Sequence, residues 1–389
     1  MPSATTRNHA LDGIRALAVA TVISYHGQTY TLASGGHAAV AVFCVLSGWL
    51  ITTGLLATHT RTGTWKTVTF YTTRAARLLP ALAILVVAVT GASLAFGGTG
   101  HIADIDTTIT ALTNAATFTT NLTLSNGNHL AFELVPTWSL ALENQYYLLL
   151  PAAAIAAAAA TRKHPARTLA AVTGAAAVCA YTYTWLAAEG STHEWMTFSP
   201  ATTCAPLLAG TAAGAYWHHH RTHITEALRA RRAWTHTALA AAITVICYAL
   251  YNPPGHPLPT STWAGPLLAA ATITLIAGTS IAVTSPVTRA LAARPLRWIG
   301  ERSYGLYLYH VPILIWVTTA AGASIAEGPG VVKVAAVILA VAAAAASYRW
   351  IETPIYSWHR RRTNLHTTPP PATIALQTHT STPVPTNAP

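Results

Sequence analysis

Charged residues are unusually scarce in this sequence. Only 8% of its 389 residues are charged, about a third of the share typical of soluble domains. Hydrophobic residues make up 52%, and the mean hydropathy is +0.40. A soluble domain of 40.9 kDa needs more charge on its surface than this, and a disordered or collagen-like chain would be far less apolar. The composition therefore predicts an all-α, polytopic integral membrane protein.

Cysteine and the common cofactor motifs are also scarce. None of the four cysteines belongs to a CxxC pair, and each lies in or beside an apolar stretch. We therefore expect small buried hydrophobes rather than disulfides or metal ligands. Without a P-loop or a G-x-S-x-G elbow, ATP-driven transport and α/β-hydrolase chemistry have no support. We expect no permanently bound cofactor and no metal, even at the histidine cluster 218–223. The four cysteines are Cys44, Cys179, Cys204 and Cys247.

Ten apolar stretches are long enough to cross a bilayer. A further segment, 107–124, is too rich in Thr and Asn for a lipid-facing helix, so we interpret it as re-entrant or interfacial. The ten stretches are approximately 11–30, 36–57, 78–97, 137–160, 168–188, 201–218, 234–252, 263–284, 303–321 and 331–350.

The net charge of +11 is distributed asymmetrically over the predicted loops. With a cytoplasmic N-terminus, 20 of the 22 basic residues, among them Arg7, Arg162 and Lys163, fall on the cytoplasmic side. The exceptions are Arg15 and Lys333. The positive-inside rule thus favours ten spans in the cell membrane, with both termini in the cytoplasm, and assigns the basic excess to topology rather than to nucleic acid. We expect one membrane domain, 1–355, followed by a disordered cytoplasmic tail, 356–389, that is first basic and then rich in Thr and Pro.

The first predicted span contains three ionisable residues, which are costly inside a membrane and suggest a function. On a helix, Asp12, Arg15 and His26 share one stripe. His26 lies about 16 Å beyond Arg15 along the axis, deep in the membrane. The alternative is an Asp–Arg pair that anchors the end of the helix, with a histidine near the outer interface.

Two arginines stand just before the third apolar stretch. Arg74 and Arg77 are three residues apart and share a helical face, and we expect Pro80 in the first turn of the third span. Two guanidinium groups on one face can bind a phosphorylated ligand. The alternative is ordinary anchoring at the cytoplasmic surface.

Two further ionisable residues lie within predicted spans. Glu143 has no basic neighbour in sequence, so it needs a partner from another helix, either His26 or Arg15. His310 lies two residues before Pro312, where a helix is locally distorted. The alternative for His310 is a core histidine bonded to the backbone.

These motifs together resemble the membrane acyltransferase 3 family. The resemblance covers about 10–355, and the chain departs from the family pattern at Cys44, Asn144 and Thr203. The last two departures leave the acceptor unassigned. The matching blocks, in order, are Leu11-Asp12-Gly13-Ile14-Arg15-Ala16-Leu17-Ala18, His26, Phe43-Cys44-Val45-Leu46-Ser47-Gly48, Arg74-Ala75-Ala76-Arg77-Leu78-Leu79-Pro80, Trp138-Ser139-Leu140 through Glu143 to Tyr147, and Ser303-Tyr304-Gly305 through His310-Val311-Pro312.

The resemblance implies a membrane enzyme that transfers an acyl group from cytoplasmic acyl-CoA, as co-substrate, to a hydroxyl. It implies that His26 is catalytic, either as a base or as a transient acyl carrier, and that Arg15 supports the site while Arg74 and Arg77 hold the donor. We place Asp12 and Glu143 in the same catalytic group. Residues expected to line the site are Ser47, Tyr304, Tyr309 and His310.

The acceptor is predicted only by class. We expect a stand-alone enzyme without a fused domain, and the Arg:Lys ratio of 19:3 with abundant Ala resembles the enzymes of GC-rich actinobacteria that acylate antibiotic sugars such as macrolides. The alternative acceptor is a cell-surface polysaccharide or glycolipid. A small-molecule transporter is the alternative from another class of function, since polar stripes also fit a substrate path. The lipid bilayer is the remaining expected partner.

Overall fold

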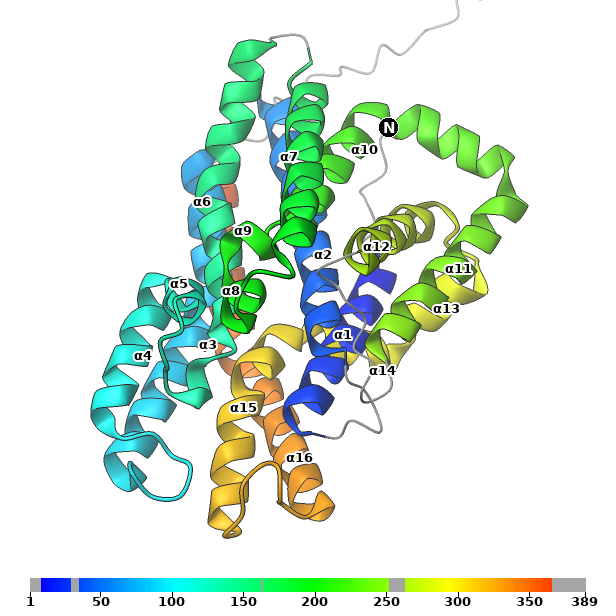
Figure 1. Cartoon of the computed structure of the whole chain (residues 1–389). Coiled ribbons are helices and arrows are strands. Elements are labelled where there is room, and N and C mark those ends of the chain that lie inside the picture. The colour runs from blue at the N-terminus through cyan, green and yellow to red at the C-terminus, as the bar shows by residue number, and fades with distance from the viewer. Residues whose placement is uncertain (1–7, 29–34, 162–163, 252–262, 366–389) are drawn as a thin grey trace, which may run out of the picture.

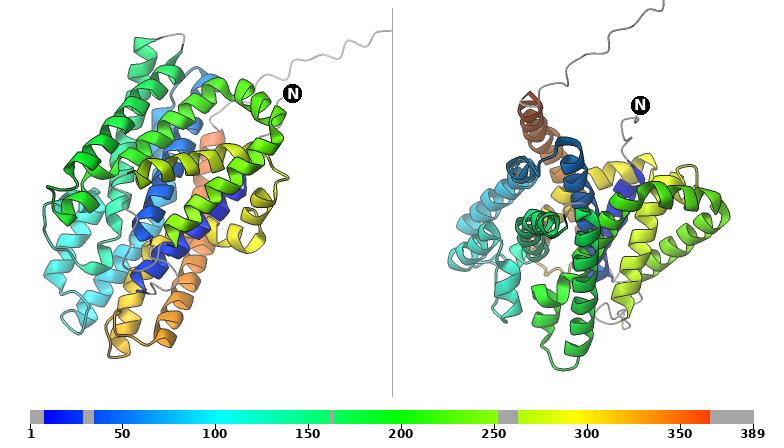
Figure 2. Two further views of the ribbon diagram at one scale, coloured as in Figure 1. Left: turned by 45° about the vertical axis from the view of Figure 1, so that its right-hand side comes forward. Right: turned by 90° about the horizontal axis from the view of Figure 1, so that it is seen from above.

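The computed structural model describes residues 8–28, 35–161, 164–251 and 263–365. Arg7, Arg162, Lys163 and the Thr/Pro-rich segment 366–389 lie outside this part. Every regular element in the described part is helical, and none is a strand, which confirms the all-α prediction. In both views of Figure 2 the helices at the start of the chain (blue) lie centrally. The segments near residues 105–150 (cyan) lie on one side of them, and those near 232–281 (green to yellow) lie on the other.

Figure 1 labels the elements in chain order. They are α1 (Ala10–His26), α2 (Gly36–Thr62), α3 (Thr67–Phe96), α4 (Ile105–Thr117), α5 (Thr120–Ser125), the 3₁₀ turn η1 (Phe132–Leu134), α6 (Thr137–Ala160), α7 (Pro165–Ala187), α8 (His193–Phe198), α9 (Pro200–Thr203), α10 (Ala205–Ala230), α11 (Arg232–Leu250), α12 (Ala264–Ile281), α13 (Pro286–Leu291), α14 (Arg294–Glu301), α15 (Ser303–Ala320), α16 (Gly330–Ser347), the π-helical turn η2 (Tyr348–Glu352) and α17 (Thr353–Leu365).

Six helical segments are long and apolar enough to cross a membrane: Gly36–Thr62, Thr67–Phe96, Pro165–Ala187, Arg232–Leu250, Ala264–Ile281 and Gly330–Thr363. The other four predicted spans are also helical, as α1, α6, α10 and α15, but they are shorter or more polar. α1, for example, has only 17 residues. Large apolar side chains such as Val87, Leu94 and Leu149 remain exposed on the outer faces, which suits contact with lipid. The chain thus has the features of a multi-pass membrane protein, although the count of ten spans is not confirmed.

The Thr/Asn-rich segment 107–124 forms two short helices, α4 and α5. Asp104 caps α4, and the hydrogen bond that its carboxylate accepts from the Thr107 N–H, at 2.8 Å, holds the pKa of this carboxyl below its usual range. The two helices part at Phe118, whose backbone is left-handed with φ 54°. The structure does not confirm that this segment is re-entrant.

Two predicted boundaries are wrong. Helix α3 begins at Thr67, so Pro80 lies inside it rather than in its first turn. The polar residues 67–77 continue the helix beyond the apolar stretch, and apolarity alone therefore placed the start too late. The predicted tail boundary at 355 falls inside α17, which continues to Leu365. This helix packs against α3, where Thr73 Oγ1 lies 3.4 Å from His359 Nε2.

The cysteines correct a third expectation. Cys44 is buried, as predicted, but Cys179 and Cys247 lie on exposed helix faces because they belong to helices whose outer surface is apolar. All four are free thiols.

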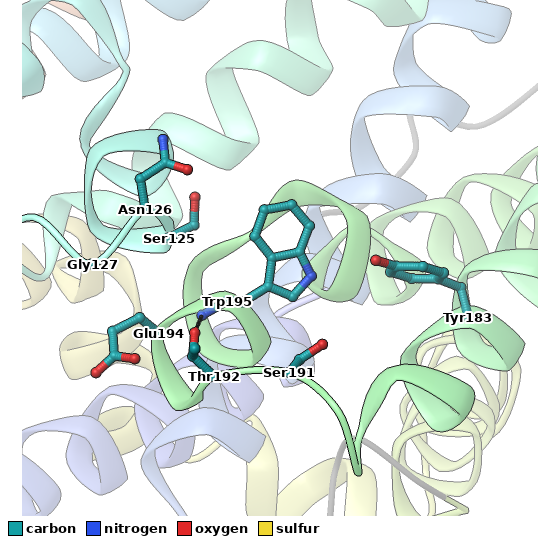
Figure 3. A pocket seen from close by; sticks show the side chains of 8 residues that line it. All are labelled: Ser125, Asn126, Gly127, Tyr183, Ser191, Thr192, Glu194 and Trp195. Carbon is teal, nitrogen blue, oxygen red and sulfur yellow. Dashed lines mark hydrogen bonds between the residues drawn. The ribbon is translucent and has the colours of Figure 1, made fainter.

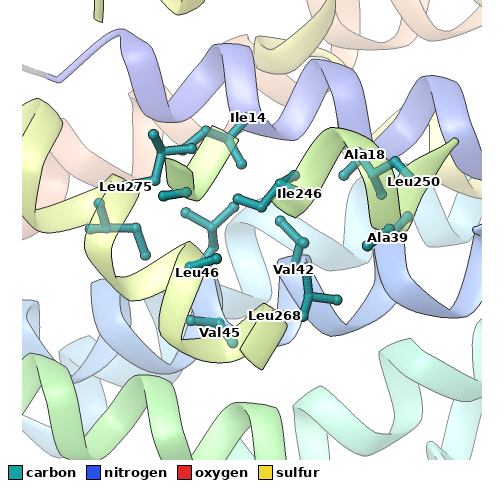
Figure 4. Close-up of a cluster of buried hydrophobic side chains, with 14 of the residues drawn as sticks. Ile14, Ala18, Ala39, Val42, Val45, Leu46, Ile246, Leu250, Leu268 and Leu275 are labelled. Atoms are coloured by element: carbon teal, nitrogen blue, oxygen red, sulfur yellow. The ribbon is translucent and has the colours of Figure 1, made fainter. Parts of the chain in front are cut away.

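The core between α1, α2, α11 and α12 consists of aliphatic side chains, among them Ile14, Leu46, Ile246 and Leu275 (Figure 4). α2 also packs closely against α10 through glycines. A Cβ at Gly48 would lie 2.3 Å from the Leu207 carbonyl oxygen. Small residues of this kind allow helix backbones to approach in membranes. The close approach fixes the position of α2, which carries Ser47.

We predict that Gly210→Ala destabilises the protein, because the added Cβ would meet the Val45 carbonyl oxygen at 2.2 Å and force α2 and α10 apart. Overpacking of this kind costs about 1–3 kcal/mol. Gly54→Ala is the matched control, since nothing lies within 4 Å of its Cβ position. Thermal unfolding of both variants in the same detergent should show a lower midpoint for Gly210→Ala only. Equal midpoints would contradict the close approach.

Candidate active site

His26 and His310 meet at the centre of the candidate site. His26 is the last residue of α1, and His310 lies in the middle of α15, where it is fully buried. His310 Nε2 lies 3.1 Å from His26 Nδ1, and the two ring centroids are 5.0 Å apart. The structure thus pairs two predicted site residues that are 284 positions apart in sequence.

The surrounding carbonyl groups determine which ring nitrogens carry protons. His310 Nδ1 lies 2.8 Å from the Tyr307 oxygen and 3.1 Å from the Leu306 oxygen, so it must be the donor. In a neutral ring, His310 Nε2 is then an acceptor. His26 Nδ1 lies 3.0 Å from the Val22 oxygen, so its N–H can serve both Val22 and His310. This assignment leaves the lone pair on His26 Nε2, which is the form that a general base requires.

Glu143 forms a second polar cluster on α6. Its carboxylate accepts hydrogen bonds from the Ser47 and Tyr147 hydroxyls, each at 2.8 Å. Arg77 and Arg15 also act on it electrostatically. The hydrogen bonds of Glu143 thus come from two hydroxyls, whereas those of His26 go to Val22 and His310 and Arg15 pairs with Asp12. Ser47, predicted to line the site, belongs to this cluster.

Arg74 and Arg77 differ in their surroundings, although both lie on α3. The Arg74 guanidinium is half-buried and lies 4.2 Å from the centroid of the Phe70 ring and 5.1 Å from that of Tyr147. Arg77 is exposed and acts electrostatically on Glu352 as well as on Glu143. Arg74 is therefore packed into the helix bundle, while Arg77 is accessible to a ligand.

The tyrosines of α15 hold this helix against its neighbours. Tyr304 donates to the Leu78 oxygen at 2.8 Å, and Tyr309 donates to the Ala81 oxygen at 3.2 Å. Both carbonyl groups flank Pro80, whose ring interrupts the hydrogen-bond ladder of α3. These two predicted site-lining residues thus join α15 to α3 at the kink-prone position.

Three residues near the histidines and Glu143 were not among the predicted site residues. The hydroxyl oxygens of Tyr307 and Ser139 lie 2.7 Å apart. The centroid of the Tyr307 ring is 5.9 Å from that of the His310 ring. Tyr147 supports Glu143, as described above. Two of the three had a sequence signal: Tyr307 precedes His310 by three residues, and Tyr147 follows Glu143 by four, so each pair shares a helix face.

Asp12 lies apart from these clusters, at the start of α1. Its carboxylate is 3.5 Å from the Arg15 guanidinium and 3.5 Å from His9. His9, Asp12 and Glu301 each place one potential metal-ligand atom within 4.8 Å of the others. However, Glu301 already forms an ion pair with Arg297 at 3.0 Å. Guanidinium groups thus already neutralise both carboxylates, which is the helix-end anchor that the sequence allowed as the alternative for Asp12 and Arg15.

Comparison with known proteins agrees with this arrangement of motifs. The model of the acyltransferase domain family matches residues 8–349. The chain belongs to this acyltransferase family. The resemblance inferred from the sequence motifs is thereby confirmed.

Two bacterial relatives of this acyltransferase are informative. The chain is 30% identical over 354 residues to the peptidoglycan O-acetyltransferase OatA of Listeria monocytogenes. The match covers 89% of this chain and 55% of the relative. The chain is 27% identical over 359 residues to the O-acetyltransferase OatA of Staphylococcus aureus, covering 89% and 56%. The chain thus spans about half the length of the curated relatives it matches. No solved structure matches it.

We predict that Arg74→Ala lowers the thermal stability of the acyltransferase more than Arg77→Ala does. The reason is that Arg74 packs on Phe70 and Tyr147, a cation–π contact worth about 0.5–2 kcal/mol. Arg74→Lys should restore only part of the loss, since an ammonium group cannot stack as a planar guanidinium does. Unfolding midpoints in one detergent provide the measurement. If Arg77→Ala is the less stable variant, the distinction between the two arginines is wrong.

Proposed function

We propose that this chain is a membrane O-acetyltransferase that transfers an acetyl group to a hydroxyl of a cell-surface glycan. The observation that carries the proposal is the contact between His26 and His310, 3.1 Å apart within a chain of the acyltransferase family. The relatives support the glycan, because the Listeria protein is named for peptidoglycan. This was the alternative acceptor in the sequence analysis. The antibiotic sugar stays a prediction that none of these relatives favours.

The proposed step uses His26 as the general base. A hydroxyl is a poor nucleophile at neutral pH until its proton is removed. His26 Nε2 takes that proton, the hydroxyl oxygen forms a bond to the thioester carbonyl carbon, and the carbon–sulfur bond breaks. The proton then passes from His26 to the departing thiolate. His310 acts as a positioning residue, since its Nε2 accepts from His26 Nδ1 and thereby keeps the lone pair on the reacting nitrogen.

Acyl-CoA is the proposed donor and Arg77 its first contact. CoA phosphates match an exposed guanidinium, which binds phosphate in a bidentate manner. Arg77 follows Arg74 by one helical turn, and Arg74 packs on Tyr147, which with Ser47 holds the Glu143 carboxylate. We assign Glu143 the role of holding these cations in place. In this proposal Arg74 supports Tyr147 by packing rather than touching the donor.

The predicted topology supplies the direction of transfer. It places the arginine-rich ends of the helices in the cytoplasm, where acyl-CoA is present, and the glycan outside. Donor and acceptor would then approach His26 from opposite sides. We propose that the acyltransferase unit extends to the end of α17, which packs against α3.

We predict that His26→Ala abolishes transfer from acetyl-CoA to glycan fragments, since loss of a general base costs about 10²–10⁴ in rate. The assay uses purified full-length protein in lipid nanodiscs and labelled acetyl-CoA. His101→Ala is the control, because His101 is an exposed histidine outside both polar clusters. Wild-type turnover by well-folded His26→Ala would remove His26 from the mechanism. Absence of any transfer by the wild-type protein would contradict the proposed function itself.

A further inference from the structure

An open pocket of about 480 Å³ lies away from both polar clusters, where three parts of the chain meet. Figure 3 shows side chains from the end of α5, from α7 and from the start of α8 around it. The volume falls in the usual range for small-ligand sites. The lining residues are Ser125, Asn126, Gly127, Tyr183, Ser191, Thr192, Glu194 and Trp195.

The lining combines two aromatic rings with short polar side chains. Trp195 lies between the Asn126 side chain and Tyr183, and the Ser191 hydroxyl lies on the Tyr183 side (Figure 3). The Trp195 backbone is fixed, because its N–H donates to the Thr192 hydroxyl at 3.2 Å. A sugar ring has apolar C–H faces and a rim of hydroxyl groups. A wide indole beside hydroxyl, amide and carboxylate groups is complementary to both.

The polar groups of the pocket are available to a ligand. Among the residues that the structure describes, the side chains of Asn126, Ser191 and Glu194 make no hydrogen bond to the protein. Asn126 and Glu194 are also exposed. Gly127 has φ +77°, and nothing lies within 4 Å of its Cβ position, so the rim is open there. A hydroxylated ligand can therefore bind without displacing an internal contact.

Direct contacts connect α8 to the histidine pair. Phe198 of α8 packs on Trp138 of α6, with ring centroids 5.5 Å apart. The neighbouring Ser139 hydroxyl lies 2.7 Å from the Tyr307 hydroxyl, and the Tyr307 ring centroid is 5.9 Å from that of His310. The helix that carries Trp195 and Glu194 is thus joined to the histidine pair through α6 and α15.

We infer that this pocket is a subsite for one sugar ring of the glycan acceptor. The ring stacks on Trp195, and its hydroxyl groups bind Glu194 and Asn126. The inference rests on the proposed function, because it takes the acceptor to be a glycan. The subsite would hold the chain of sugars while a hydroxyl of a neighbouring ring reaches His26.

The test uses full-length protein in nanodiscs, acetyl-CoA as donor and a β-1,4-linked tetramer of N-acetylglucosamine as acceptor. Trp195→Ala should raise the KM for the tetramer about tenfold or more, as removal of a central aromatic contact does. The KM for acetyl-CoA and its slow hydrolysis should not change. Trp195→Phe should retain most of the binding, because it keeps an aromatic face.

Trp185→Ala is the matched control, since Trp185 is 64% exposed near the end of α7 but does not line the pocket. Glu194→Gln is a second variant in case Trp195→Ala folds poorly, and it should also raise the KM for the tetramer. An unchanged KM for the tetramer in both Trp195→Ala and Glu194→Gln, with transfer intact, overturns the subsite and leaves the proposed function standing.

Direct binding separates the remaining outcomes. Saturation-transfer NMR should detect the tetramer on the wild-type protein and not on Trp195→Ala. If binding follows this pattern but no acetyl group is transferred, the subsite is supported and the proposed function fails. If glycerophosphocholine displaces the tetramer at equal concentration, the pocket is a lipid headgroup site and the inference is overturned.

Discussion

The hydrogen bond between His26 and His310 is the contact on which the rest of the site depends. Two imidazoles inside an apolar bundle are costly unless each polar nitrogen has a partner. Here three carbonyl groups and one imidazole provide those partners, at 2.8–3.1 Å. The contact also joins α1 to α15, which are far apart in sequence. It leaves one ring nitrogen, His26 Nε2, for chemistry.

A second group of contacts organises the other end of the site. Glu143 accepts hydrogen bonds from a serine of α2 and a tyrosine of its own helix, and this tyrosine packs against Arg74 of α3. The basic residues Arg74 and Arg77 thus lie near the Glu143 cluster, while the aromatic, hydroxyl-lined pocket at α8 lies apart from both polar clusters. In the proposed function, the donor binds near these arginines and the acceptor binds at the pocket.

Much of this could be predicted from the sequence. The low charge predicted the all-helical fold with apolar helices, and the ordered motifs predicted the family. The roles of His26, Glu143 and His310 stay predictions, although the structure brings His26 and His310 together. Spacing along one helix shows which residues share a face, but it cannot show which helix that face contacts. Glu143 was therefore assigned a histidine or arginine partner, whereas its hydrogen bonds come from Ser47 and Tyr147.

The same limit applies to the arginines and to Pro80. The sequence places Arg74 and Arg77 on the same helix face and does not distinguish them. The structure does, because Arg74 packs against Phe70 and Tyr147. The start of α3 was placed by apolarity, which does not detect the polar helical turns before it. The pocket at α8 gave no sequence signal, because its lining comes from three segments and no motif joins them.

The most direct test of the account is the protonation state of His26. Solid-state NMR of ¹⁵N-histidine-labelled protein in bilayers reports it, with His26→Gln used to assign the resonances. The account predicts a protonated Nδ1 and an unprotonated Nε2 on His26, with both resonances shifted in His310→Gln. A proton on His26 Nε2 in the wild-type protein would contradict the account. So would His26 resonances that do not change in His310→Gln.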